Sequence, residues 1–219
     1  MARFNKNTSR VRTTIRKTLL LGGLEDYSID QRRAMWPEAK PLKAKHIQNC
    51  KLVENQVKML EHMPKGGVCA ELGVLEGDFS ALILEFTAPE KLHLVDIRSQ
   101  SIDVAAERFS NEISQGTVEV HLGDSAEFIN SKPDNYFDWI YVDGDHSNVG
   151  VKRDSDAIKP KLKPGGIIAL NDYTFFDPSR FSKFGIVEAA NEFCIDNDFE
   201  LIFLALQGRM YNDIAIKAL

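Results

Sequence analysis

The stretch Cys69-Ala-Glu71-Leu-Gly73-Val-Leu-Glu76-Gly77-Asp78-Phe-Ser80 decides the fold of this chain. It closes a short apolar run, and apolar residues then recur at helical spacing from Phe79 to Phe86. A buried strand, a glycine turn and a helix N-terminus together form a cofactor cradle at the carboxyl edge of a parallel sheet. The spacing Glu-x-Gly-x-x-x-Gly differs from the dinucleotide fingerprint Gly-x-Gly-x-x-Gly. A purely structural turn is the alternative interpretation.

Downstream of this stretch, short apolar segments alternate with helical patterns. Strands are expected at residues 92–96, 118–123, 137–143 and 167–170, and each is separated from the next by a segment with helical periodicity. Strands that alternate with helices indicate βαβ units and a parallel sheet covered on both faces.

The C-terminal end of the chain has a different pattern. A helix around residues 187–194 precedes apolar runs at 199–206 and 213–217, and only six residues separate these two runs. Six residues with a glycine cannot form a helical crossover, so the last two strands should be an antiparallel hairpin. The expected fold is α/β: a doubly wound, Rossmann-like sheet of seven strands, mostly parallel with an antiparallel last strand, and helices on both faces.

The N-terminal region differs in composition from the rest. Residues 1–24 carry six basic residues and no acid, a composition that is also found in transit peptides. We expect residues 1–40 to form a basic arm and connector, solvated or docked on a partner, and residues 41–219 to form a single domain. Apolar residues spaced by three and four predict a helix from Leu42 to about Met63, with His46 and His62 on its surface.

Composition limits the classes of function. The chain has 219 residues, a net charge of −5 and a hydrophobic share of 43%, as expected for an ordinary globular domain. The charge gives no sign of nucleic-acid binding, and no apolar run approaches the roughly 18 residues of a membrane span. Three widely spaced cysteines favour reduced thiols and hence a cytoplasmic location.

Several motifs, taken in order, carry a family resemblance. The Glu71-x-Gly73-x-x-x-Gly77 loop, the strand-end acids Asp96 and Asp124, and the turn at residues 163–166 resemble the class I S-adenosylmethionine (SAM)-dependent methyltransferases over residues 45–219. More narrowly, residues 142–147 (Val-Asp-Gly-Asp-His-Ser) with residues 171–173 (Asn-Asp-Tyr) resemble the metal-dependent O-methyltransferases of sugars and natural products. The same residues resemble the catechol and caffeoyl-CoA O-methyltransferases more distantly.

The resemblance implies a set of SAM-binding residues. Asp96 would accept both ribose hydroxyl hydrogens and Asp124 would lie at the adenine, although a capping or surface role is the alternative for Asp96. SAM has no phosphate, so acids near the glycine loop are tolerable, whereas they would be unfavourable beside the pyrophosphate of NAD. The full expected set is Glu71, Gly73, Gly77, Ser80, Asp96, Asp124, Ser125 and Asp143.

The same resemblance implies a metal and a general base. Asp143, Asn171 and Asp172 end adjacent strands, and their oxygen atoms suit Mg²⁺ or Mn²⁺, which would lower the pKa of a bound hydroxyl. His146 would take the hydroxyl proton, with Asp143 as the second catalytic residue. Asn171 departs from the family pattern, in which the metal pair is two acids or an acid followed by Asn. Alternatively, Asp145 and His146 pair and cap the next helix, and residues 171–172 form a turn.

We therefore expect an enzyme that moves the methyl group of SAM to a hydroxyl of a sugar, glycan or polyhydroxylated small molecule. A homo-oligomer is possible. Two other classes stay open: an NAD-type oxidoreductase on the same sheet, and a SAM-binding protein without turnover that serves a glycan-assembly complex through its basic arm. Metal binding and turnover separate the last class from an enzyme.

Overall fold

A computed structural model describes residues 28–34, 39–177, 182–208 and 211–219. The chain divides between Glu38 and Ala39, and the described part of the first unit contains helix α2 (Ile29–Ala34). Most of the expected basic arm, residues 1–27 and 35–38, lies outside the described residues, so its role stays a prediction. Within the described parts, no helix is both long and apolar enough to span a bilayer.

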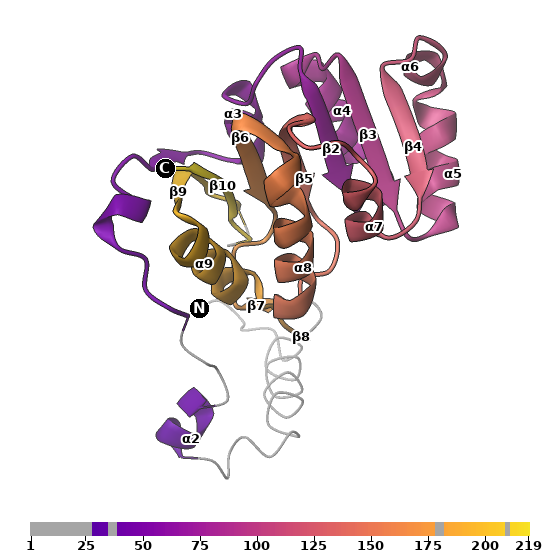
Figure 1. Cartoon of the computed structure of the whole chain (residues 1–219). Helices are drawn as coiled ribbons and strands as arrows, with labels where there is room; N and C mark the ends of the chain where they lie inside the picture. The colour runs from indigo at the N-terminus through magenta and orange to yellow at the C-terminus, as the bar shows by residue number, and fades with distance from the viewer. Residues whose placement is uncertain (1–27, 35–38, 178–181, 209–210) are drawn as a thin grey trace, which may run out of the picture. The chain divides into compact units, whose positions relative to one another are not determined.

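The second unit is built on an eight-stranded sheet with the order β1-β9-β10-β6-β5-β2-β3-β4 (Figure 1). The alternating pattern of the sequence produces the parallel part of this sheet, since from β1 to β9 at least one helix lies between one strand of the large sheet and the next along the chain, whereas β9 is followed directly by β10. The strands are β1 (Lys51–Val53), β2 (Val68–Leu72), β3 (Lys91–Asp96), β4 (Val118–Leu122), β5 (Phe137–Val142), β6 (Leu162–Leu170), β9 (Phe199–Ala205) and β10 (Asp213–Ala218).

Strand β10 is the antiparallel member of the sheet. It pairs antiparallel with β9 and with β6, whereas the other neighbouring pairs are parallel. The predicted terminal hairpin and the α/β architecture are therefore confirmed. The sheet has one strand more than predicted, because β1 adds to the edge beside β9. A second, two-stranded sheet consists of β7 (Phe176–Asp177) and β8 (Ser182–Lys183).

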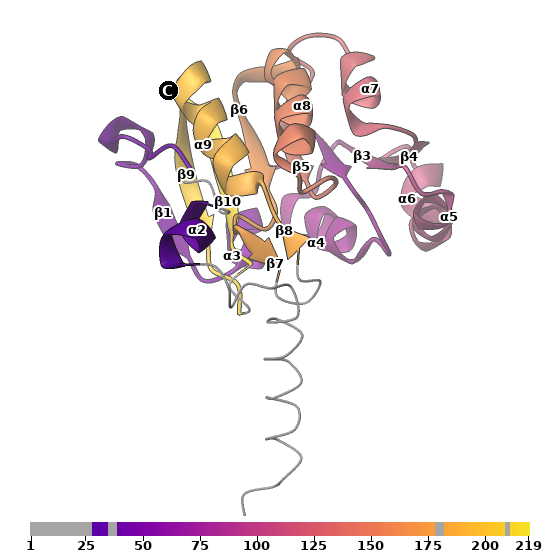
Figure 2. The same ribbon diagram turned by 90° about the horizontal axis from the view of Figure 1, so that it is seen from below.

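Helices cover both faces of the large sheet (Figure 2). On one face, α7 (Ser125–Asn130), α8 (Asn148–Ile158) and α9 (Ile186–Asn197) bury apolar residues against β5, β6 and β10. On the other face, α3 (Gln56–Glu61), α4 (Asp78–Thr87) and α5 (Ser99–Arg108) do the same against β2, β3 and β9, and α6 (Ser110–Ser114) packs its partly buried Ile113 on this core. These two cores hold the strands rigid and fix the carboxyl edge on which the site is built.

The predicted helix over residues 42–63 is wrong. The segment contains a short 3₁₀ turn (Ala44–His46), strand β1 and the six-residue helix α3. The helical spacing of its apolar residues is overridden because Lys51–Val53 pairs with Phe203–Ala205 at the open edge of the sheet. Asn55 then begins α3, where its side chain accepts a hydrogen bond from the Lys58 amide at 3.0 Å.

The two histidines of this segment have different environments. His62 is exposed, as predicted, and its ring stacks on Phe203 with centroids 5.2 Å apart. His46, predicted at the surface, is 1% exposed, and its Nδ1 accepts a hydrogen bond from the Lys43 amide at 3.3 Å. His46 lies in the 3₁₀ turn, and there its side chain is buried, whereas the predicted helix placed it on the surface.

Candidate active site

The strands end in a cavity of about 660 Å³ at the carboxyl edge of the sheet. This is the edge at which open α/β sheets bind ligands, and the volume lies in the range of small-molecule sites. Backbone hydrogen bonds hold the connecting loops together: the Asp143 amide donates to Leu72, and the Asn171 amide donates to Val142. The cavity is lined by Leu72, Gly73, Leu75, Val95, Asp96, Ile97, Arg98, Gly123, Asp124, Ser125, Asp143, Gly144, Asp145, His146, Arg153, Asn171 and Asp172.

The glycine loop after β2 brings two backbone segments into close approach. Gly73 has φ +93°, and a Cβ placed on it would lie 2.1 Å from the carbonyl oxygen of Asp143. Only glycine allows this conformation and this contact, so Gly73 sets one wall of the cavity. Gly77 has φ +74° at the start of α4, and a Cβ there would lie 2.8 Å from the Phe109 ring. Gly77 does not line the cavity, so its role is to turn the chain into α4.

Glu71 and Ser80, two expected SAM contacts, lie in the core instead. Glu71 is 1% exposed and accepts a hydrogen bond from the Ser80 hydroxyl. Burial raises the pKa of Glu71 well above its usual value, and the charges of Asp143 and Asp96 raise it further, against the hydrogen bond from Ser80. Neither side chain lines the cavity. The pair ties β2 to α4 and thereby supports the loop between them.

Asp96 lies at the end of β3, as predicted, and is 4% exposed. Its Oδ2 accepts hydrogen bonds from the Val74 amide at 3.0 Å, the Leu75 amide at 3.2 Å and Arg98 Nη2 at 3.1 Å. Its Oδ1 accepts from the Arg98 amide at 2.8 Å and from Arg98 Nε at 3.1 Å. Burial alone would raise the pKa of Asp96, but the hydrogen bonds from Arg98 and the two amides lower it well below its usual value. Asp96 is therefore ionised and already holds the glycine loop.

Two apolar side chains beside Asp96 were missed by the sequence reasoning. Ile97 is 72% exposed and Leu75 is 60% exposed, and both line the cavity. Leu75 has φ +51°, an uncommon conformation for a non-glycine residue. Exposed apolar surface next to strand-end carboxylates suits a ligand with a flat apolar part and hydroxyls, such as a nucleoside. The signal in the sequence was an apolar residue directly after a strand-end acid.

Asp124 and Ser125 line the same cavity after β4, as predicted. Asp124 Oδ1 accepts a hydrogen bond from the Glu127 amide at 3.1 Å at the start of α7, and its Oδ2 lies 3.0 Å from Arg153 Nη2. The Ser125 hydroxyl donates to Asp154 Oδ1 at 2.7 Å. Arg153, which the sequence reasoning did not single out, neutralises this end of the cavity.

His146 lies between two carboxylates. Its Nε2 is 3.4 Å from Asp143 Oδ1 and 3.5 Å from Asp172 Oδ2. Its Nδ1 lies 3.0 Å from the carbonyl oxygen of Gly144, which can only accept, so Nδ1 carries the hydrogen and Nε2 of the neutral ring holds the lone pair. In the described structure Nε2 is buried and has no hydrogen-bond partner. Burial lowers the pKa of His146, but the hydrogen bond and charge of Asp143 and the charge of Asp172 outweigh it and raise the pKa above 6.5.

The alternative interpretation, in which Asp145 and His146 pair and cap the next helix, holds for Asp145 and not for His146. Ser147 begins α8 and accepts a hydrogen bond from the Gly150 amide at 3.0 Å, while Asp145 Oδ1 accepts from the Ser147 amide at 2.9 Å. The cap thus belongs to Asp145 and Ser147. His146 is left to stack on Phe184, with ring centroids 4.7 Å apart, and to face the carboxylates.

The expected metal ligands do not form an oxygen-lined site in this structure. Asn171 turns its amide group to Asp143, with Nδ2 donating to Oδ1 at 2.6 Å, and its oxygen lies 3.2 Å from the Tyr141 hydroxyl. Asn171 therefore offers a hydrogen, and not a lone pair, to the space beside Asp143. Asp172 has φ +54°, so the alternative of a tight turn after β6 describes this point well.

A chain of buried hydrogen bonds connects Asn171 and Asp172 to strand β10. The Tyr141 hydroxyl lies 2.8 Å from Asp213 Oδ2, and Asp213 Oδ1 accepts from the Asp172 amide at 3.3 Å. Burial raises the pKa of Asp213 to about 7, and the charges of Asp172 and Asp143 act in the same direction, against the hydrogen bonds from Tyr141 and Asp172. Asp213, missed from the sequence because it begins the hairpin's second strand, joins β10 to the site.

Comparison with known proteins agrees with the fold. Residues 70–173 match the sequence model of the Methyltransf_24 family, described as a methyltransferase domain. A spermine synthase from Arabidopsis thaliana is 29% identical over 125 residues, which are 51% of this chain and 34% of the synthase. The chain thus spans about a third of the length of that curated relative.

Solved structures show the same fold at low sequence identity. A SAM-dependent methyltransferase from Aquifex aeolicus superposes with a TM-score of 0.56 at 13% identity, covering 88% of this chain and 100% of that one. A spermidine synthase from Thermotoga maritima gives a TM-score of 0.53 at 19% identity, covering 74% and 56%. The chain therefore shares the Rossmann-like fold of these structures, and its residues 70–173 match a methyltransferase domain.

Proposed function

We propose that the protein is an enzyme that transfers the methyl group of SAM to a hydroxyl of a sugar or other polyhydroxylated small molecule, with His146 as proton acceptor. The observation that carries this proposal is the position of His146, which lines the cavity and holds its Nε2 3.4 Å from Asp143 Oδ1 and 3.5 Å from Asp172 Oδ2. A base held between two carboxylates is stabilised in its protonated form, the form that a hydroxyl attack would produce.

The residues present fit SAM at the glycine-loop end of the cavity. Ile97 and Leu75 supply exposed apolar surface for the adenine, and Asp124 with Arg153 supplies polar groups beside it. Asp96 can accept the ribose hydroxyls only if the Arg98 guanidinium leaves its two oxygens. The Arg98 side chain is 56% exposed, so this exchange needs a rotamer change of one surface side chain. SAM supplies an electrophilic methyl group when bound.

The chain's own residues would handle the proton of the acceptor. Gly144 fixes the tautomer of His146, so Nε2 is the atom that removes the hydroxyl hydrogen. Asp143 and Asp172 then hold the imidazolium, and Asn171 keeps Asp143 oriented through its 2.6 Å hydrogen bond. The Mg²⁺ or Mn²⁺ expected from the sequence does not enter this mechanism, because Asn171 occupies Asp143 Oδ1 with a hydrogen. The proposed acceptor class rests on the resemblance of residues 142–147 and on the polar lining of the cavity.

A polyamine-synthase activity is the second candidate, and the likeness to spermine synthase is the observation that favours it. Four aspartates of the lining, Asp124, Asp143, Asp145 and Asp172, would suit a cationic amine. The test is an incubation of the full chain with methyl-labelled SAM and panels of sugars, polyols and amines, followed by mass spectrometry. The proposal expects a methylated hydroxyl compound. Methylation of amines alone would overturn the proposed acceptor class. In a separate incubation with decarboxylated SAM and amines, formation of spermine or spermidine would replace the proposal with the second candidate.

A further inference from the structure

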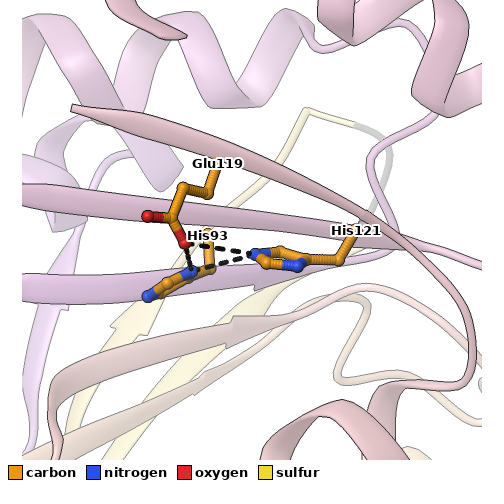
Figure 3. Close-up of side chains that lie close together, drawn as sticks. All are labelled: His93, Glu119 and His121. Atoms are coloured by element: carbon orange, nitrogen blue, oxygen red, sulfur yellow. Dashed lines mark hydrogen bonds and ion pairs between the residues drawn. The ribbon is translucent and has the colours of Figure 1, made fainter. Parts of the chain in front are cut away.

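Two histidines and a glutamate meet on the outer strands of the sheet, away from the cavity. His93 lies on β3, and Glu119 and His121 lie on β4, the edge strand (Figure 3). In the parallel register His93 is opposite Glu119, and Val95 is opposite His121. Because side chains alternate between the two faces of a strand, the three point to the same face. The Phe128 ring of α7 lies against both imidazoles, with centroids 5.4 and 4.4 Å away.

The three side chains direct one donor atom each at a common point. His93 Nδ1 is 3.1 Å from His121 Nε2 and 3.4 Å from Glu119 Oε2, and His121 Nε2 is 3.7 Å from Glu119 Oε2. Zn²⁺ bonds of about 2.0–2.1 Å in a tetrahedron place neighbouring ligand atoms about 3.3–3.4 Å apart. The three separations bracket this value, so an ion fits with little movement of the side chains.

Other contacts of the same residues hold these donor atoms in place. His93 Nε2 lies 3.0 Å from the Tyr136 hydroxyl, and Lys91 Nζ lies 2.6 Å from Glu119 Oε1. If His93 donates its Nε2 hydrogen to Tyr136, its Nδ1 is left with a free lone pair directed at the cluster. Lys91 likewise fixes one oxygen of Glu119 and leaves the other facing the imidazoles. Metal-binding histidines are commonly oriented by such a contact on their second ring nitrogen.

The protonation state of the two histidines suits a metal. Burial lowers the pKa of His93 to about 4, with the charges of Lys132 and His121 acting in the same direction, and burial also lowers the pKa of His121. Both rings are therefore neutral at pH 7, as metal ligands must be. The lysines beside the cluster, Lys91 and Lys132, add positive charge and reduce the affinity for a cation, whereas Glu119 offsets one of them.

We propose that His93, Glu119 and His121 bind one divalent transition-metal ion, Zn²⁺ by preference, through two imidazole nitrogens and one carboxylate oxygen. Imidazole with carboxylate is a ligand set that Zn²⁺ accepts and that Mg²⁺ does not favour. Glu119 and His121 side chains are 44% and 28% exposed, so water can take the fourth position. None of the three residues lines the cavity, and the ion would tie edge strand β4 to β3. The metal-free alternative is an imidazole–imidazole hydrogen bond beside a Lys91–Glu119 ion pair.

The binding step requires only a change of tautomer. His93 keeps its Nε2 hydrogen on Tyr136, and His121 moves its hydrogen from Nε2 to Nδ1, so each ring stays neutral and binds the ion through its other nitrogen. No proton is released at neutral pH.

The test is Zn²⁺ binding to the full chain after treatment with a chelator, followed by competition with a chromophoric chelator and metal analysis. The informative variants are His121→Gln and Glu119→Gln, which change partly exposed side chains. Tyr136→Phe removes only the contact on His93 and should weaken binding about 10–100-fold. His62→Gln is the matched control, since His62 is an exposed histidine elsewhere on the same unit. Asp143→Asn tests for a Zn²⁺ site in the cavity, because it removes a carboxylate there.

The proposal expects one equivalent of Zn²⁺ that His121→Gln and Glu119→Gln abolish and that His62→Gln and Asp143→Asn retain. Free Zn²⁺ at about 100 times the Kd should also raise the melting temperature by roughly 5–10 °C, in the wild type and not in His121→Gln. The absence of Zn²⁺ binding, binding that His121→Gln leaves unchanged, or binding lost only in Asp143→Asn would overturn it. Folding of each variant is checked by circular dichroism, so lost binding is not confused with an unfolded chain.

Discussion

His146 Nε2 lies 3.5 Å from Asp172 Oδ2, although one residue follows β5 and the other follows β6. The contact exists because parallel strands bring their carboxyl ends to one edge. Asp143 Oδ1 lies 3.4 Å from the same nitrogen, so the two carboxylates hold a histidine of raised pKa at the wall of a cavity that fits a small molecule. The first two predictions follow from this arrangement.

Replacing His146 by Gln should lower the methyl-transfer rate by about 10²–10⁴-fold, the usual contribution of a general base. SAM affinity should change little, because the proposed SAM contacts lie at the glycine-loop end of the cavity and His146 is not among them. His146 also stacks on Phe184, so a modest loss of melting temperature is expected. Phe184→Leu is the control for that loss, since it removes the stacking partner and keeps the base. A His146→Gln enzyme with the turnover of Phe184→Leu would remove His146 from the mechanism.

The pH dependence of the rate should show an acid limb that belongs to His146. A base must be unprotonated, so the rate falls as the pH drops through the pKa of His146, which lies above 6.5. Asp172→Asn removes one of the charges that raise this pKa and should move the limb to lower pH. Rates measured from pH 5.5 to 9 in both proteins provide the test. An unmoved limb would assign it to another group.

Chelation should leave methyl transfer unchanged, because Asn171 places a hydrogen at Asp143 Oδ1. The measurement compares the rate before and after removal of divalent ions, with Mg²⁺, Mn²⁺ and Zn²⁺ added back separately. Asn171→Asp makes the test stricter, since it restores two adjacent acids and should create Mg²⁺ binding. A wild-type rate that disappears on chelation and returns with Mg²⁺ would reinstate the metal expected from the sequence.

Asp96→Asn should weaken SAM binding by about one to two decades, the value of a lost hydrogen bond to a charged group. The melting temperature should fall too, because Asp96 also accepts from the Val74 and Leu75 amides. Arg98→Gln separates the two effects: it frees the carboxylate and should leave SAM affinity equal or tighter. Asp156→Asn, at an exposed acid of α8, is the matched control. Weaker SAM binding in Arg98→Gln would show that Arg98 itself contacts SAM.

Asp213 should make the protein less stable as the pH rises. Its pKa is about 7 in the folded chain and about 3.9 when unfolded, so the folded state holds the proton more tightly. Its contribution to the free energy of unfolding is present below about pH 4 and decreases by at most about 1.4 kcal/mol per pH unit up to about pH 7. Asp213→Asn should remove this slope in urea unfolding measured at several pH values. An unchanged slope would show that Asp213 is ionised at neutral pH.

The sheet was predictable because most strands and helices of residues 68–206 have a clear local periodicity of apolar residues in the sequence. The terminal hairpin was predictable for a different reason: six residues cannot form a crossover. Strand β1 was not predictable, since three residues gain their extended form only by pairing with Phe203–Ala205. His46 was placed wrongly because its burial depends on the same unexpected turn.

The sequence predicted which residues lie at the strand ends that form the site. It did not predict which side chains these residues contact. Asp96, Asp124, Asp143 and His146 all line the cavity, because a strand end fixes where a residue lies. Their partners could not be read from the chain: Arg98 on Asp96, Arg153 on Asp124 and Asp213 behind Tyr141 depend on side-chain directions. Glu71 and Ser80 share the motif of the loop but point into the core.

Calorimetric titration of the full chain with SAM, its demethylated product and NAD tests the central claim most directly. Asp96 and Asp143 line the cavity beside Gly73, and these carboxyl groups would be unfavourable beside the pyrophosphate of NAD, whereas SAM carries no phosphate. We predict saturable 1:1 binding of SAM and of its product, weakened in Asp96→Asn, and no binding of NAD. Binding of NAD without binding of SAM would contradict the assignment of the cavity.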